Sequence, residues 1–394
     1  MRISHFVLGY FIDSVKSGWW ADFFYPALDL LKTAPIIAIR GNHEICDRAG
    51  FGYFLFMSPL DYPPGIPAGS WCKEFESPFS VPFENEQFLI MDDSAITPYL
   101  SGVDHFTETI LRPDGGFDVI FEQIPSDDSS ETQFVGSIDT CPGPPGPDDG
   151  PIIPVVQSRF WDPNQSNETI LAQVARYSRE MEVLGNLSLS HATNFYAAHR
   201  PLFAVDCNDT WMVTLDWTMQ ESLGPNTLDR VSASINGHMH WLEVLSFYND
   251  TLPKQIVVGH GGTKLIDNNV HQDALKGMWL RVGREQMYSG VIEKGITSSE
   301  GFGFGIMERD GSGDYKVIFK NLNQTSGDLY DVDFNLAIPK GPRVNIGALG
   351  TTSTTTATGG IQMVGTASSS ATRYVPFPGW GLAAVSIIYF SCIR

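Results

Sequence analysis

The sequence has few positive charges for its length. Among 394 residues, 25 are Lys or Arg and 45 are Asp or Glu, which gives a formal net charge of −20. Such a surface repels the phosphate backbone of DNA and RNA, so we do not expect nucleic acid as a partner. A small anionic ligand would need a local positive centre, and bound metal ions are one way to supply it.

Cysteine is also scarce, and none of the five cysteines forms a C-x-x-C or C-x-x-H pair. This absence argues against a zinc-finger type of site. Cys46 and Cys72 are spaced to close a disulfide loop, and Cys141 with Cys207 is a second candidate pair. Cys392 lies in an apolar tail, where we expect it to be unpaired.

No apolar run reaches the roughly 20 residues of a membrane-spanning helix. The apolar stretch at 379–393 has 15 residues. It follows small residues and a short spacer, an order that resembles a GPI-attachment signal. The tail is therefore a candidate for membrane attachment. The alternative, which we weigh equally, is a disordered end whose last residues are apolar.

Six N-x-S/T sequons favour a secreted or cell-surface glycoprotein, if the source is eukaryotic. The apolar residues after Arg2 end at Asp13 and Lys16, too early for a signal peptide. We therefore expect that the true N-terminus has been lost, with a cytosolic protein carrying chance sequons as the alternative. The sequons begin at Asn164, Asn167, Asn186, Asn208, Asn249 and Asn323.

Short apolar segments predict buried strands, and several of them end directly at polar clusters. A helix is predicted at 20–32 from the spacing of its apolar residues, and a second helix is predicted at 168–184. Strands are predicted at 5–12, 35–39, 88–91, 195–198, 231–235, 241–248 and 256–259.

Three of these strands lead into clusters that carry metal-binding side chains: GNHE at 41–44, AAHRP at 197–201 and GHMH at 237–240. Strands in a sheet deliver their last residues to one edge, where loops gather ligands from distant parts of the chain. Asn and His together suit borderline-hard cations such as Zn, Mn or Fe. A single such cluster is more often structural, but three in this order are specific.

The order GNHE, then AAHRP, then GHMH resembles the calcineurin-like metallophosphoesterases, which include the purple acid phosphatases. RGNHEICDRAGFGYFLF and IVVGHGGTKL are similar to stretches of a secreted branch of that superfamily, and the resemblance covers roughly residues 18–320. It implies an α+β fold in four α/β/β/α layers, with two mixed β-sheets packed as a sandwich flanked by helices. It also implies hydrolysis of phosphate esters, with the individual substrate left open.

The resemblance implies two divalent or trivalent metal ions, of Fe, Zn or Mn, and a metal-bridging hydroxide that attacks phosphorus. Asn42, His199 and His238 correspond to ligands of one metal, and His240 to a ligand of the other. His43 resembles the catalytic histidine that protonates the leaving group.

Three further residues take secondary roles in this reading. Glu44 resembles the acidic partner that orients the catalytic histidine. Arg200 and His260 are candidates to contact substrate. Arg200 could instead pair with an acidic neighbour, and His260 could instead satisfy backbone groups in its loop.

The sequence departs from the family pattern at its start. The family begins with a D-x-H motif and a G-D motif whose aspartate bridges both metals, and the chain has Gly9-Tyr10 where G-D is expected. Asp13, 29 positions before Asn42, is the nearest candidate for the bridging carboxylate, although its surroundings differ. We therefore expect impaired hydrolysis in the chain as it stands. A catalytically inactive glycoprotein that keeps the fold is the alternative.

Composition divides the chain into three parts. Residues 1–335 form the predicted metallophosphoesterase domain, without its N-terminal metal motifs. Residues 346–375 are a Ser/Thr/Gly-rich linker of low complexity. Residues 376–394 form the apolar C-terminal tail.

Overall fold

The structure is a computed structural model of the chain that describes most of the residues from Trp19 to Ile338. Asp13, the Gly9-Tyr10 pair, Asn164, Cys141 and the 346–375 linker lie outside the described residues. The described ranges are 2–8, 19–96 without 47 and 69, 105–111, 117–123, 167–338 with short gaps (209, 214–216, 262–264, 266–274, 278, 284–286 and 324), and 386–392.

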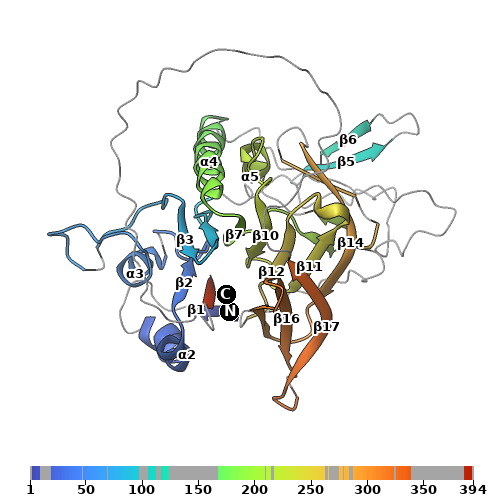
Figure 1. The fold of residues 1–394 in the computed structure, drawn as a ribbon. Coiled ribbons are helices and arrows are strands. Elements are labelled where there is room, and N and C mark those ends of the chain that lie inside the picture. Colours follow the sequence, from blue (N-terminus) through green and yellow to red (C-terminus); the bar gives the residue numbers. More distant parts are fainter. Residues whose placement is uncertain are drawn as a thin grey trace, which may run out of the picture.

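Within these ranges the fold is α+β, with two large sheets and few helices (Figure 1). The larger sheet has eight strands in the order β13-β14-β11-β12-β10-β7-β4-β3. Their bounds are β3 Phe79–Phe83, β4 Glu86–Ile90, β7 Thr193–Ala197, β10 Val231–Asn236, β11 Leu242–Phe247, β12 Lys254–Val258, β13 Trp279–Val282 and β14 Tyr288–Ser298.

The centre of this sheet is parallel. β4 pairs with β7, β7 with β10, and β10 with β12, all in the parallel sense. Parallel neighbours end at the same edge of a sheet, so the loops after β4, β7, β10 and β12 meet there. The predicted strands at 88–91, 195–198, 231–235 and 256–259 are confirmed, and this edge collects the residues that follow them.

The smaller sheet has six strands in the order β17-β16-β15-β1-β18-β2. It is mixed, because β1, β18 and β2 are parallel neighbours while β15, β16 and β17 run antiparallel. Its strands are β1 Arg2–Leu8, β2 Ile36–Ile39, β15 Gly303–Arg309, β16 Tyr315–Leu322, β17 Leu329–Ile338 and β18 Ser386–Cys392.

Two boundaries of the predicted domain need correction. β17 extends to Ile338, which is fully buried, so the domain does not end at 335. β18 comes from the predicted tail of 376–394, yet it lies between β1 and β2 in the smaller sheet. The physical reason is length, because a segment of seven residues with Ile-Ile-Tyr-Phe at its centre suits a strand better than a membrane span. Attachment of the tail to a membrane stays a prediction.

Both faces of the larger sheet are buried, as the alternation of its side chains shows. Phe88 and Ile90 of β4 face a core cluster shared with Ile37, Ile39 and Phe319 of the smaller sheet. Leu89 and Met91 point the other way, into a second cluster. In a strand, neighbouring side chains alternate between faces, so an uninterrupted apolar run can fill both.

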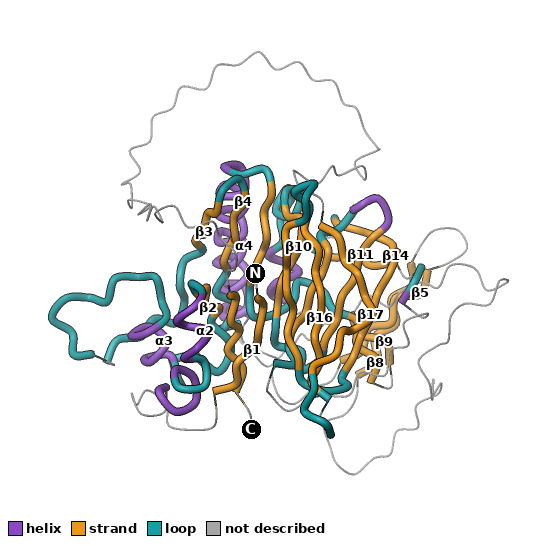
Figure 2. The backbone as a smooth tube through the Cα atoms, turned by 60° about the horizontal axis from the view of Figure 1, so that its bottom comes forward, coloured by secondary structure: helices purple, strands orange, loops and turns teal. Residues whose placement is uncertain are grey.

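Helices cover the outer faces of the sheets. α4 (Asn167–Leu187) and α5 (Trp217–Ser222) join the second cluster, on the side away from β16 and β17 (Figure 1). The structure confirms the helix predicted at 168–184. α3 (Gly50–Phe56) and α2 (Leu28–Thr33) lie beside β2, where Ala38 packs with Trp19, Phe23 and Tyr53 (Figure 2).

The helix predicted at 20–32 is wrong in its middle. A π-helix, η1 (Trp20–Phe24), comes first, and α2 begins only at Leu28. Pro26 lies between them and has no N–H to donate, so the regular ladder is interrupted. The amide of Tyr25 instead bonds the carbonyl of Trp20, five residues back.

The remaining elements are short. Two hairpins stand apart from the large sheets, and two 3₁₀ turns flank strands. They are β5 His105–Leu111 with β6 Phe117–Gln123, β8 Val205–Asn208 with β9 Thr210–Val213, η2 Ser188–Ser190 and η3 Tyr248–Asp250. None of the helices in the described ranges is both long enough and apolar enough to cross a membrane.

A disulfide between Cys46 and Cys72 confirms the first predicted pair. It joins the segment after β2 to the segment before β3, with Cα atoms 5.7 Å apart and 26 residues of separation. A covalent link of this kind limits the freedom of the unfolded chain more than that of the native fold.

Replacing Cys46 and Cys72 together by Ser lowers the free energy of unfolding by about 3 kcal/mol, since the unfolded chain regains the entropy of that loop. Urea denaturation under non-reducing conditions measures the difference, and a reducing agent has no further effect on this loop in the variant. An unchanged midpoint and slope would contradict this role of the disulfide.

Candidate metal centre

Three of the four predicted metal ligands meet at one point. The Nε2 atom of His199 lies 2.9 Å from Oδ1 of Asn42 and 3.0 Å from Nδ1 of His238. The two imidazole rings meet edge to face, with centroids 4.9 Å apart. The chain thus brings together residues that are 157 and 39 positions apart in sequence.

A shared cation would satisfy these three atoms better than hydrogen bonds among them can. His199 Nε2 faces both neighbours and can carry only one proton, so it cannot donate to Asn42 while it accepts from His238. A metal ion uses the lone pairs of two imidazole nitrogens and an amide oxygen at once, which removes this conflict. The donor set therefore fits one borderline-hard cation.

The described residues offer less for a second cation. Across all the described residues, with the surroundings of His199 and His238 included, no group of three or more His, Cys, Asp or Glu side chains is placed to hold a metal ion. His240 lies in the same loop as His238, two positions further on, and is partly exposed. Asp13 lies outside the described residues, so the two-metal arrangement stays a prediction.

Backbone geometry fixes the loop that carries His238. This residue adopts a left-handed conformation with φ of 62°, which is uncommon for a residue with a side chain. The amide of Gly237 donates to the carbonyl of His199 at 2.9 Å, and the amide of Met239 donates back to Gly237. The two histidine loops are therefore tied together through their main chains.

Gly259 lies directly beneath this loop. A Cβ atom at that position would sit 1.5 Å from the carbonyl oxygen of Met239, and the Gly259 amide donates to Trp241 at 3.1 Å. Only a residue without a side chain permits this close approach of two main chains. Sequence reasoning could have noted the glycine after β12 but not the partner that it packs against.

Arg40 anchors the loop that carries Asn42. Its buried guanidinium donates to the carbonyl of Glu44 at 2.8 Å and forms an ion pair with Asp92 at 2.8 Å. The same group donates to the carbonyl of Glu74 at 3.0 Å and lies over the Phe54 ring. This network links the end of β2 to the end of β4.

Glu44 makes a contact with Gly41 that the sequence did not predict, and its role as the partner that orients His43 stays a prediction. Its side chain is fully buried, and its Oε2 accepts a hydrogen bond from the amide of Gly41 at 3.1 Å. A glutamate three residues after a turn start tends to reach back in this way, as in a capping box. Burial raises the pKa of Glu44 to about 8.

His43 follows Asn42 directly and is partly exposed, unlike His199, which is fully buried. Its role as the residue that protonates the leaving group stays a prediction.

The two candidates for substrate contact are both buried. Arg200 is 4% exposed, and its guanidinium donates to the carbonyl of Ile96 at 3.4 Å. His260 is fully buried, its Nε2 lies 3.0 Å from Oδ1 of Asn321, and burial lowers its pKa to about 4. The contact of either residue with a substrate, and the two alternatives for them, stay predictions.

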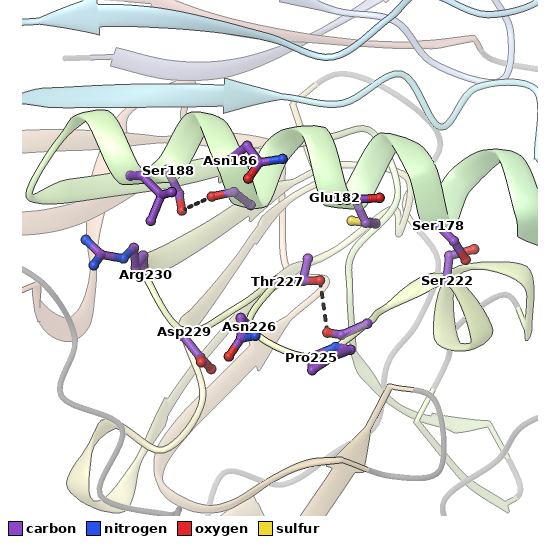
Figure 3. Close-up of a pocket in the computed structure, with 14 residues that line it drawn as sticks. Ser178, Glu182, Asn186, Ser188, Ser222, Pro225, Asn226, Thr227, Asp229 and Arg230 are labelled. Atoms are coloured by element: carbon purple, nitrogen blue, oxygen red, sulfur yellow. Dashed lines mark hydrogen bonds between the residues drawn. The ribbon is translucent and has the colours of Figure 1, made fainter. Parts of the chain in front are cut away.

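A polar cleft with a volume of about 880 Å³ lies at the other end of the sheet (Figure 3). Figure 3 shows Glu182 and Asn186 of α4 facing Asn226 and Thr227 of the loop before β10. That loop precedes β10, whereas His238 follows it, so the cleft and the histidines occupy opposite ends of the strand.

Two predicted glycosylation sites have described side chains, and both are exposed. Asn186 lies at the rim of the polar cleft, and Asn323 lies in the turn between β16 and β17. Asn167, Asn208 and Asn249 fall within α4, β8 and η3. Glycosylation itself stays a prediction for all six sequons.

Gly259→Ala displaces the 237–240 loop, because the new methyl group overlaps the carbonyl of Met239. We expect the free energy of unfolding to fall by about 1–3 kcal/mol, as for other overpacked sites. Urea denaturation measures this, with Gly311→Ala as the control, since a Cβ there meets open space. Equal free energies of unfolding for the two variants would contradict this prediction, because they would show that the loop moves aside without destabilising the fold.

Glu76 makes stability depend on pH. It accepts hydrogen bonds from Tyr53 and Ser58, and burial raises its pKa to about 7 from an ordinary value of 4.5. Between these values the folded protein holds a proton that the unfolded chain has released. Stability from this group is therefore present below pH 4.5 and is lost as pH rises through 7, by roughly 3 kcal/mol at most.

The test compares unfolding of the wild type and Glu76→Gln at pH 5 and pH 8. The variant should lose less stability over this range, because its amide does not titrate. Glu74→Gln, at an exposed neighbouring position, should follow the wild type. Parallel pH profiles for wild type and Glu76→Gln would contradict the assignment.

The assignment of this centre depends on the chain's own residues. No protein family model matches the sequence, and no curated protein matches it. The convergence of Asn42, His199 and His238 therefore carries what can be inferred about function.

Proposed function

We propose that the chain is a metal-dependent phosphoesterase of the calcineurin-like type, with an impaired or incomplete site. The single observation that supports this most strongly is the approach of Asn42 Oδ1, His199 Nε2 and His238 Nδ1 within 2.9 and 3.0 Å. The three residues belong to the three motifs that resemble that superfamily, and their order along the chain is the family order.

The proposed fold is the four-layer sandwich of that superfamily. Its support is the core shared by the two sheets, together with helices that pack on their outer faces. In such an architecture the metal ligands lie in the loops at one end of the sheets, which is where β2, β7 and β10 end.

The net negative charge of the chain explains why a phosphate ester would need a bound cation. The chain carries a formal net charge of −20, so a phosphate ester approaches a repelling surface. A cation held by Asn42, His199 and His238 would supply Lewis-acid stabilisation of the charge on the phosphoryl group.

The chain's own residues account for the rest of the chemistry. His199 is buried, so it can hold the cation but cannot reach the substrate. His238 and Asn42 are partly exposed and can face the substrate. His43 can hold the proton that the leaving oxygen requires, since an imidazole nitrogen can carry and donate a proton. The buried Arg200 and His260 are left as parts of the scaffold.

With Mn²⁺ added, we expect slow hydrolysis of a chromogenic aryl phosphate by the wild type. His43→Ala should lower that rate by about 100-fold or more while leaving Mn²⁺ affinity unchanged, because the residue donates a proton and does not bind metal. Asn42→Ala should weaken Mn²⁺ binding itself. His191→Ala is the control, because His191 precedes β7 and so lies at the opposite edge of the sheet from His199.

Isothermal titration with Mn²⁺ and steady-state rates on the same preparations separate these effects. Full activity in His43→Ala and Asn42→Ala would end the proposal. Metal binding without any turnover in the wild type would favour the alternative, a glycoprotein that keeps the fold without catalysis.

A further inference from the structure

Two buried side chains form hydrogen bonds with the main chain of the turn that carries His199. The carboxylate of Asp93, which follows β4, accepts the amide of His199 at 3.1 Å and that of Arg200 at 2.8 Å. The amide group of Asn236, at the end of β10, donates to the carbonyls of Ala198 at 3.0 Å and Arg200 at 2.8 Å. Both side chains are fully buried.

Every peptide unit of this turn is therefore fixed from outside. Asp93, after β4, accepts two of the amides, while β10 supplies the Asn236 donors and, through the carbonyl of Ile235, the acceptor for the Ala198 amide. The remaining carbonyl, that of His199, accepts the amide of Gly237 at 2.9 Å. A turn held on all its polar groups has little freedom to rotate the imidazole away.

Asn236 is itself held in one orientation. Its Oδ1 accepts the hydroxyl of Ser234 at 2.6 Å and the side-chain amide of Gln255 at 2.7 Å. With the oxygen occupied by two donors, the NH₂ group must point at the carbonyls of the turn. The residue also directly precedes Gly237-His238, so one side chain joins both histidine loops.

We propose that Asp93 and Asn236 are positioning residues that aim His199 Nε2 at Asn42 and His238, and so set the affinity of the metal centre. This inference rests on the proposed function and extends it to residues that none of the three motifs contains. Groups that orient metal ligands typically change metal affinity by about 10- to 100-fold when they are replaced.

Asn236→Asp is the sharpest test, because it keeps size and shape but turns two donors into an oxygen that faces the carbonyls of Ala198 and Arg200. Asn194→Asp is the matched control. Asn194 is also a fully buried asparagine whose NH₂ group donates to the carbonyls of Ser188, His191 and Arg230. It lies in β7, at the start of the strand that ends before His199.

The first readout is Mn²⁺ affinity by isothermal titration of the folded chain. We expect a loss of about 10- to 100-fold in Asn236→Asp and a change of less than about twofold in Asn194→Asp. Ser234→Ala and Asp93→Asn provide further variants if Asn236→Asp does not fold. Ser234→Ala frees the asparagine oxygen, and it should cause a smaller loss in the same direction. Equal losses in Asn236→Asp and Asn194→Asp would overturn the proposal.

The second readout is the metal-free crystal structure of each variant. The distance between His199 Nε2 and His238 Nδ1, 3.0 Å in this structure, should lengthen in Asn236→Asp and stay the same in Asn194→Asp. An unchanged distance in Asn236→Asp would overturn the proposal. A wild type that binds no Mn²⁺ would sink the proposed function alone, since this second readout needs no metal.

Discussion

The candidate site depends on the pairing of buried main-chain groups in one short turn. Ala198, His199 and Arg200 leave β7 inside the protein, where water cannot satisfy their amides and carbonyls. An unpaired polar group in such a place costs about 1–3 kcal/mol, so each must find a partner in the fold. The partners come from the ends of β4 and β10, and the turn is therefore built from three strands at once.

This constraint follows from the burial of the larger sheet on both faces. Apolar side chains alternate into two core clusters, one shared with the smaller sheet and one with α4 and α5. Because β4, β7 and β10 are parallel neighbours, their final residues reach the same edge at fixed spacing. The residues that follow β7 and β10 therefore lie close together, which brings His199 next to His238, while Asn42 reaches His199 from the end of β2 in the smaller sheet.

Sequence alone was sufficient for the features that short-range patterns encode. Continuous apolar runs identified the parallel strands, and the helix expected at 168–184 is α4. One failure was local, because Pro26 interrupted a helix that the apolar spacing predicted. The other depended on distant partners, because the predicted tail became a strand between β1 and β2 of the smaller sheet.

The same limit applies to the site. The three motifs contain the side chains that converge, Asn42, His199 and His238. The motifs could not show that Glu44 turns back onto Gly41, that His260 is enclosed beside Asn321, or that Asp93 bonds a turn 106 residues away. Local sequence patterns do not reveal which of these side chains come together in the folded protein.

The most direct test of the central claim is anomalous X-ray diffraction from crystals soaked in ZnCl₂. The account predicts one peak between Asn42 Oδ1, His199 Nε2 and His238 Nδ1, about 2.0–2.2 Å from each atom. Anomalous density elsewhere on the chain, with these three side chains free of metal, would contradict it.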